Sequence, residues 1–431
     1  MIGWLLENTL PKLRSAMNEL TKTAVFFVTA AILSLVALMV DPGDVTPDIF
    51  DDQGESFFPA FADPQAPRSI EVIDYNEETA TAKPLKVEFI NNKWVLPSHH
   101  YYPADAEKRL ASTAAALMEL RKDMIISDRI EHHSDYGVID PLDGNVTTLA
   151  GRGKRVTLRD KNGRILADFV VGRKVGGKAG YRYLRVPSQR RTYAVETDAD
   201  VSAEFSDWIE TDLLKLTASD IRKISINSYS INERRGVLEN LERNTLSRRG
   251  NKWYMSGGRT PRDNKVNALM EALDNLHIVG VQPKPAALTR DLKTRNGIQI
   301  SVDSVTSLRQ KGFFLNAQGQ LFSNEGEIIV ETANGLKYTL RFGEIAPGAK
   351  GAPKEEEAGK DAAAQEYRYL FITVNHDAAR AKHYSGKGKS PDQQGEILAR
   401  ELRNRFANWY YVIPGGDFSN LRPSRRDLLR G

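Results

Sequence analysis

The sequence predicts an α+β fold in which a single N-terminal transmembrane helix precedes two tandem copies of an antiparallel-sheet-plus-helix unit and a C-terminal helix. Two observations predict this arrangement. Residues 24–40 form a run of seventeen residues without a charge, in a chain that is 27% charged overall. From residue 68 onward, one series of strand, turn and helix patterns occurs twice in the same order. At 431 residues, the chain is long enough for two or three domains with separate cores.

The uncharged run 24–40 is long enough to cross a bilayer once. As a helix rising about 1.5 Å per residue it would reach roughly 25 Å, and local thinning of the roughly 30 Å hydrocarbon core can cover the difference. Lys and Arg precede the run, whereas residues 41–67 carry seven acidic residues and neither cation. The positive-inside rule then makes residues 1–23 a cytoplasmic tail. The expected location is the bacterial inner membrane, with a single pass and the bulk of the chain periplasmic.

A cleaved signal peptide is the alternative to a retained anchor. The run is longer than the usual h-region of about 7 to 15 residues, and Met39-Val40-Asp41-Pro42 offers no small-x-small cleavage site. We therefore expect the helix to be retained. Residues 41–67 also contain five prolines, which indicates an extended acidic linker.

The first half of the repeated unit is a Trp strand followed by an amphipathic helix. Asn92-Lys93-Trp94 matches Asn251-Lys252-Trp253, and each is followed by a Pro-x-Asp motif, at Pro103 and Pro261. Apolar residues at helical spacing then follow in both copies. They are Leu110, Ala114, Leu117 and Met124 in the first copy, and Val266, Leu269, Met270, Leu273 and Leu276 in the second. A strand pair precedes each Trp.

The second half of the unit is a hairpin and a closing strand. Asn162-Gly163 and Asn334-Gly335 each lie between alternating apolar segments, the strongest short-range signal for a hairpin. A glycine follows each second strand, at Gly172 and Gly343, and then the tetrapeptide Tyr-Arg-Tyr-Leu occurs in both copies. The second copy carries an insert at residues 347–366, which we expect to be a flexible loop.

These patterns predict the following organisation of the chain. Each unit is an antiparallel sheet with helices on one face. The predicted segments are a cytoplasmic tail (1–23), a transmembrane helix (24–40), an acidic linker (41–67), a first repeat (68–200), a connector (201–220), a second repeat (221–380), and a C-terminal helix and tail (381–431). The apolar spacing of residues 392–412 predicts the C-terminal helix.

Several motifs follow one another in a fixed order in the first copy. They are Trp94, Pro103-Ala104-Asp105, Tyr136-Gly137, Asp140-Pro141, Gly172 and Tyr181-Arg182-Tyr183. This series resembles the domain-of-unknown-function family DUF4340, in two tandem copies over roughly residues 68–380. The ending at residues 405–413 is similar to that of planctomycete-type members. The second copy departs from the pattern because it lacks the Tyr-Gly-x-x-x-Pro motif and carries extra strands around Phe313 to Phe322.

The resemblance implies a membrane-anchored protein, often encoded near ABC-type export permeases and gliding-motility auxiliary components. It implies no catalytic residues. Composition excludes other classes: the absence of cysteine excludes disulfides, thiolate zinc sites and thiol catalysis, and a net charge of +4 without a long basic block does not indicate nucleic-acid binding.

The candidate sites have simpler structural interpretations. Adjacent histidines diverge on any regular element, so a metal site would need His99-His100 and His132-His133 to meet, and we expect solvated turn histidines instead. Asp135, Asp140 and Asp143 lie near His133 in sequence, but Asp140-Pro141 is typical of a turn.

The glycine-rich stretch 172–180 fits neither phosphate-loop pattern and is expected to be a hairpin loop. Ser256-Gly257-Gly258 lacks the following helix of a nucleophile elbow. We expect Trp94 and Trp253 in the core, and the Arg-Arg pairs at 190, 234 and 248 at solvated strand ends. No catalytic, cofactor-binding or metal-ligating residue is predicted, and no cofactor.

The expected function is that of a membrane-anchored extracytoplasmic structural or interaction module, as an accessory subunit of an ABC-type export or cell-envelope machine. Its expected partners are the inner membrane and another membrane or envelope protein, such as an ABC-type permease. The alternative is an ectodomain that binds glycans or lipids in a cleft between the copies. A third hypothesis, an envelope hydrolase, requires the histidine pairs or acidic residues to converge in one pocket.

Overall fold

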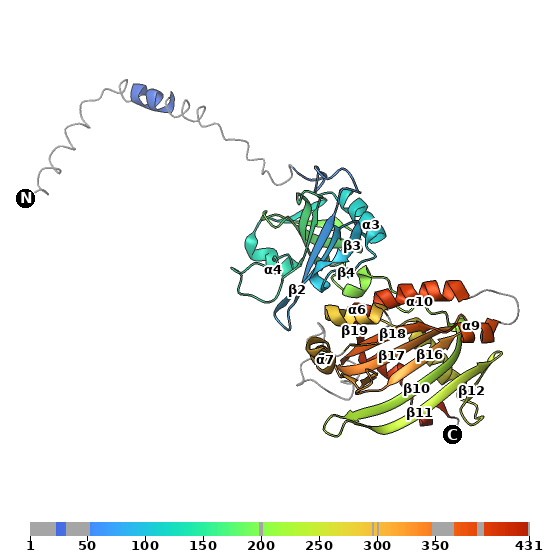
Figure 1. Ribbon diagram of the computed structural model, residues 1–431. Coiled ribbons are helices and arrows are strands. Elements are labelled where there is room, and N and C mark those ends of the chain that lie inside the picture. The colour runs from blue at the N-terminus through green and yellow to red at the C-terminus, as the bar shows by residue number, and fades with distance from the viewer. Residues whose placement is uncertain are drawn as a thin grey trace, which may run out of the picture. The chain divides into compact units, whose positions relative to one another are not determined.

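Figure 1 shows the computed structural model of the chain, which describes residues 23–31, 52–197, 201–294, 297–299, 301–346, 366–385 and 392–429. The chain divides into two compact units, Met1–Gly54 and Glu55–Gly431. The predicted cytoplasmic tail except its last residue, residues 41–51 of the predicted linker and residues 347–365 of the predicted insert lie outside the described residues.

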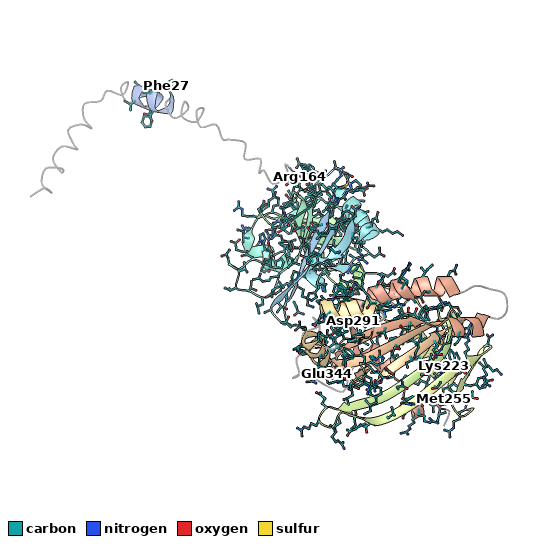
Figure 2. The ribbon with its side chains drawn as sticks, viewed as in Figure 1. Phe27, Arg164, Lys223, Met255, Asp291 and Glu344 are labelled. Carbon is teal, nitrogen blue, oxygen red and sulfur yellow. The ribbon has the colours of Figure 1, made fainter. Side chains whose placement is uncertain are left out.

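The prediction of a transmembrane helix over residues 24–40 is wrong. The described N-terminal helix spans residues 23–31, which at about 1.5 Å per residue gives roughly 14 Å, about half of the hydrocarbon core. None of the described helices has both the length and the apolar character needed to cross a membrane. This finding overturns the single-pass inner-membrane location as well. Phe26 and Phe27 are 79% and 78% exposed on this helix, and Phe27 is labelled in Figure 2.

Within the described residues, the first sheet has nine strands in the order β4-β3-β2-β1-β6-β7-β8-β9-β5. Neighbouring strands are antiparallel throughout. The strands are β1 (Ser69–Asn76), β2 (Thr81–Ile90), β3 (Lys93–Leu96), β4 (Tyr102–Pro103), β5 (Met124–Ser127), β6 (Lys154–Arg159), β7 (Ile165–Lys174), β8 (Tyr181–Arg185) and β9 (Thr192–Glu196).

The second sheet has eight antiparallel strands among the described residues, in the order β12-β11-β10-β16-β17-β18-β19-β13. They are β10 (Ile221–Asn232), β11 (Val237–Arg249), β12 (Lys252–Met255), β13 (Gly280–Pro283), β16 (Glu327–Thr332), β17 (Leu336–Ile345), β18 (Tyr367–His376) and β19 (Trp409–Pro414). A separate pair consists of β14 (Phe313–Leu315) and β15 (Leu321–Ser323).

The two sheets share one strand order once β4 is set aside. Read across the sheets, β3, β2, β1, β6, β7, β8, β9 and β5 correspond to β12, β11, β10, β16, β17, β18, β19 and β13. The counterpart of β9 is therefore β19, which overlaps the end of the helix expected over 392–412. Helix α10 covers only Asp392–Ala407, because the apolar run that follows it, Trp409 to Pro414, pairs with β18 and β13.

Helices α3 (Glu107–Met118) and α5 (Asp263–Asp274) follow the two Trp strands. Each buries most of the apolar positions that its spacing predicts, Leu110, Ala114 and Leu117 in α3 and Val266, Leu269 and Leu273 in α5. The prediction is wrong for Met124, which lies in β5; Met270 is only partly buried, and Leu276 is buried beyond the end of α5. Trp94 and Trp253 are partly buried against the same core. The other helices are α4 (His133–Tyr136), α6 (Ala286–Thr294), α7 (Val302–Arg309), α9 (Ala378–Ser385), α11 (Gly415–Leu421) and α12 (Arg425–Leu428).

The second sheet is covered on both faces. In β18, Leu370 and Ile372 belong to the main core, while Tyr369 and Phe371 belong to a second, smaller core. Since alternate residues of a strand point to opposite faces, the two cores lie on opposite sides of the strand. The second core includes Leu288 of α6 and Leu308 of α7, so the expectation of helices on one face only is wrong here.

Residues 55–67 are packed on the fold and are not the extended spacer that was expected. Phe57 and Phe61 are buried in the main core. The Phe57 amide donates to the carbonyl of Leu120 at 3.0 Å, and its ring meets Tyr193 edge-on with centroids 5.1 Å apart. The two aromatic residues give this part of the segment enough apolar surface to outweigh its acidic composition.

Lys284, between β13 and α6, is buried, and within the described residues its ammonium group bonds to backbone carbonyls and not to a carboxylate. Its Nζ donates to the carbonyls of Phe406 at 2.7 Å and Trp409 at 2.5 Å, and lies 3.9 Å from the ring centroid of Phe371. Burial lowers the pKa of Lys284 well below its usual range. The side chain thereby joins the C-terminal end of α10, where helix carbonyls favour a cation, to the start of β19.

A glycine in the second hairpin strand allows another segment to cross closely over each sheet. A Cβ at Gly172 would lie 2.7 Å from Cγ1 of Val138 and overlap the carbonyl oxygen of Tyr136. A Cβ at Gly343 would lie 2.8 Å from Cζ of Phe313 and overlap the carbonyl oxygen of Lys311. In both sheets the crossing segment therefore leaves no room for a side chain at this glycine.

We expect Gly172→Ala to destabilise the protein by about 1–3 kcal/mol, because the methyl group overlaps backbone that cannot move without shifting α4. Gly176→Ala is the matched control, because a Cβ there meets nothing within 4 Å. The measurement is the midpoint of urea unfolding. Equal midpoints for the two variants would contradict the close crossing.

Candidate functional site

A polar cavity of about 540 Å³ opens on the first sheet. Two irregular segments form its walls: residues 130–148, which follow β5, and the turn 187–190 between β8 and β9. Its ionisable lining residues are Glu131, His133, Asp140, Asp143, Arg155, Arg185 and Arg190.

Arg152 holds the first wall in place. Its guanidinium donates to five backbone carbonyls of the loop 140–148, which curves around it: Asp140 (3.1 Å), Pro141 (3.2 Å), Asp143 (3.0 Å), Val146 (2.7 Å) and Thr148 (3.3 Å). The same guanidinium lies 5.1 Å from the ring centroid of Tyr75. A planar donor fork can satisfy several converging carbonyls, which an ammonium group does less well. The loop is therefore fixed by the protein itself.

Arg185 holds the second wall. It is 6% exposed, its Nε donates to the carbonyl of Val138 at 2.9 Å, and its Nη1 donates to the carbonyls of Pro187 at 2.9 Å and Gln189 at 3.0 Å. Burial lowers the pKa of Arg185, and the nearby carboxylates of Asp140 and Asp143 oppose this effect. One side chain thus fixes the turn 187–190 to the segment that crosses Gly172.

Arg155 of β6 belongs to a partly buried ion network on the cavity wall. Its Nε and Nη2 bind the two carboxylate oxygens of Asp168 at 3.0 and 2.8 Å, and its Nη1 binds Asp140 at 2.8 Å. The hydrogen bonds that Arg155 donates to Asp168 raise the pKa of Arg155. The bidentate pair with Asp168 orients Arg155, whose Nη1 then holds Asp140 at the start of the loop.

His133 of α4 is buried and joins α4 to the second wall. Its Nε2 lies 2.7 Å from the carbonyl oxygen of Arg190, a contact in which the imidazole N–H donates. Burial lowers the pKa of His133, against the smaller opposing effect of this hydrogen bond. Because Nε2–H is engaged with a carbonyl, His133 serves as a structural donor. The cavity as a whole presents fixed hydrogen-bonding groups.

A second concave feature lies on the second sheet. The β10–β11 hairpin projects beyond the rest of its sheet (Figure 1). Between its tip and the β14–β15 pair is a groove of about 450 Å³, which we call the hairpin groove. Its apolar lining residues are Ile231, Val237, Leu238, Phe314, Leu315 and Phe322. Val237 and Leu238 are 45% and 39% exposed. Apolar side chains at a projecting tip are typical of interaction surfaces.

Comparison with known families identifies one stretch of the chain. Residues 94–294 match the family described as Domain of unknown function (DUF4340). The match is a single copy that begins in β3 and ends with α6, so the predicted two tandem copies are not confirmed by it. It includes both walls of the polar cavity. Neither the curated proteins nor the solved structures contain a match.

Within the DUF4340 match, His100 lies at an exposed turn, as expected, whereas His133 is buried, so the expectation of solvated turn histidines is wrong for His133. His99 stacks on Phe205 with ring centroids 4.7 Å apart. His132 contacts the Ser127 hydroxyl through Nδ1 at 3.0 Å, and its ring meets Tyr136 edge-on. His133 lines the polar cavity as described. Among the described residues, no group of three or more His, Asp or Glu side chains is arranged to hold a metal ion.

The remaining candidates are turns and strand ends. Gly172 lies in β7, and residues 175–180 connect β7 to β8, with the Lys178 ammonium 3.6 Å from the ring centroid of Tyr181. Ser256 and the two glycines after it follow β12 as a turn. Arg191 pairs with Asp128 at 2.7 Å. Of these glycine-rich, serine and Arg-Arg candidates, Arg190 alone lines the polar cavity within the described residues.

Sequence reasoning missed the two arginines that shape the cavity. A signal for Arg152 is its position in Gly151-Arg-Gly153, where a Cβ at Gly153 would lie 2.5 Å from the carbonyl oxygen of Gly137. A signal for Arg185 is that the tetrapeptide Tyr-Arg-Tyr-Leu is followed by Arg185 at its first occurrence and by Phe371 at its second. A charged residue where the same tetrapeptide is elsewhere followed by an apolar one indicates a local difference in structure.

We expect the stability of the protein to fall as the pH drops from about 7 to about 5, with His133 contributing part of the loss. The pKa of His133 is lower in the folded state than its ordinary value of 6.5. In this window the unfolded chain binds more protons, so stability rises with pH and is lost as the pH falls. His133→Gln should reduce the slope of the urea midpoint against pH. His100→Asn, at an exposed turn, should leave it unchanged; equal slopes for both variants would contradict this role.

Arg152→Lys should loosen the loop over residues 140–148. The variant leaves several partly buried carbonyls without a donor, at about 1–3 kcal/mol in total, which corresponds to about tenfold faster amide exchange in this loop. The measurement is hydrogen–deuterium exchange with mass spectrometry. Arg164→Lys is the control, at an exposed turn labelled in Figure 2. Unchanged exchange over residues 140–148 would show that the loop does not depend on Arg152.

Proposed function

We propose that this protein is a structural and interaction module that binds an extended segment of a partner protein in the hairpin groove. The observation that carries the proposal is the exposed apolar lining of this groove, contributed by the tip of β10–β11 on one side and by β14–β15 on the other. Exposing apolar side chains to water is unfavourable, so covering the tip of this hairpin with a partner would be favourable.

The backbone around the groove supports an extended occupant. Within the described residues, β14 pairs with β15 alone, so its other edge has N–H and C=O groups available. An added strand would pair with this edge and place alternate side chains against Phe314 and Leu238. Arg309 and Glu233 at the rim supply one charge of each sign. We therefore expect a segment with apolar residues at alternate positions and few charges.

We further propose that the two sheets are tandem copies of one DUF4340 unit. Matching strand order and the equivalent close crossings at Gly172 and Gly343 support this interpretation. Under it, α7 and Gly312 are the counterpart of α4 and Gly137, since both glycines have positive φ, +79° and +68°, directly before the crossing. The second copy then differs by its longer connections, which form the hairpin groove. An ABC-type permease, the partner that the family resemblance implies, is one protein that the experiment can detect.

The test is site-specific photo-crosslinking in the full-length protein. A photoreactive amino acid replaces Leu238 in the groove, and in a control it replaces Ile165, which is 49% exposed on the first sheet. We expect a partner protein crosslinked at 238 and not at 165. Its crosslinked segment, as a synthetic peptide, should bind the purified protein, and Leu238→Asp should weaken this binding at least about tenfold.

Each variant is first checked by its melting temperature, so that unfolding is not mistaken for lost binding. Ile165→Asp should leave peptide affinity unchanged. Equal crosslinking at both positions, or a peptide whose affinity is insensitive to Leu238→Asp, would overturn the proposed function.

A further inference from the structure

The polar cavity on the first sheet is formed before any ligand arrives. Arg152 fixes one wall through five carbonyls and Arg185 fixes the other through two carbonyls of the turn. Its volume of about 540 Å³ falls in the range of about 300–1,000 Å³ that is typical of small-molecule sites. We propose that this cavity binds a neutral, polyhydroxylated ligand of the size of a mono- or disaccharide.

The position of Arg185 supports a ligand that accepts hydrogen bonds. Its Nε and Nη1 donate to backbone carbonyls, and within the described residues no hydrogen bond comes from Nη2. The residue is 6% exposed and lines the cavity. Nη2 does not belong to the buried polar atoms that lack a partner, so solvent reaches it, and an acceptor on a ligand in the cavity can replace that water.

The balance of charge favours a neutral ligand. The lining contains three arginines and three carboxylates, and Asp140 and Asp143 act directly on Arg185. An anion would meet these carboxylates, and a cation would meet the arginines. A hydroxyl group donates and accepts at the same time, so several hydroxyls can use both kinds of lining group.

Apolar lining residues complete this description. Ile139, Leu142 and Val146 belong to the wall that Arg152 holds. They offer an aliphatic surface to the C–H groups of a sugar ring, while Asp143 and Arg185 offer an acceptor and a donor. The site is independent of the hairpin groove, because it shares no lining residue with it. Failure of one proposal therefore leaves the other in place.

The test is ligand-observed NMR and calorimetry on the full-length protein. The probes are glucose, galactose, N-acetylglucosamine, maltose and cellobiose, with glucuronate, inorganic phosphate and glycine as charged comparisons. We expect at least one neutral saccharide to bind with a Kd on the order of millimolar or tighter, and more tightly than any charged probe.

Asp143→Asn should weaken this binding about fivefold to tenfold, since it removes a charged acceptor and keeps the shape of the side chain. Glu78→Gln, at the exposed β1–β2 turn, is the matched control and should bind like the unaltered protein. Arg185→Lys is a second variant, read together with its melting temperature. The proposal is overturned if none of the neutral saccharides binds, if phosphate or glucuronate binds more tightly, or if Asp143→Asn and Glu78→Gln bind equally.

Discussion

Buried or partly buried basic side chains that donate to backbone carbonyls are the interaction on which the irregular parts of this protein depend. Sheets and helices satisfy their own backbone groups, but the loops between them do not. Arg152 and Arg185 supply these donors in the first half, and Lys284 supplies them at the junction of α10 and β19 in the second. A carboxylate partner would neutralise each charge but leave the carbonyls unsatisfied. The cations therefore fix loop geometry, and the polar cavity exists because two of them fix its walls.

Equivalent positions in the two sheets carry different residues. At the position after Tyr-Arg-Tyr-Leu, β8 carries Arg185 and β18 carries Phe371. Phe371 is fully buried, and the cation that satisfies carbonyls at the start of β19 comes from Lys284, which lies over the Phe371 ring. In the first half the cation reaches the surface of a cavity, whereas in the second it is enclosed by α6 and α10. The two sheets share one strand order, and their buried side chains differ where the connections between the strands differ.

Local signals in the sequence predicted the hairpins, and long-range constraints explain what was missed. Asn162-Gly163 and Asn334-Gly335 do lie in the turns β6–β7 and β16–β17, although only the glycines have positive φ, +78° and +80°. Each turn is longer than two residues, so a single left-handed glycine closes it. The prediction of a spanning helix over 24–40 came from composition alone, and no described helix has the length and apolar character to cross a membrane. Arg185 bonds to Val138, 47 residues away, and no local pattern encodes that contact.

Asp140 and His133 also have structural partners of this kind. Asp140 is held by Arg155, and its other oxygen accepts the amide of Leu142 at 2.9 Å. His133 donates to a backbone carbonyl, and burial lowers the pKa of its imidazole. The hydrogen-bonding groups of Asp140 and His133 are therefore used to hold the segments that form the cavity walls.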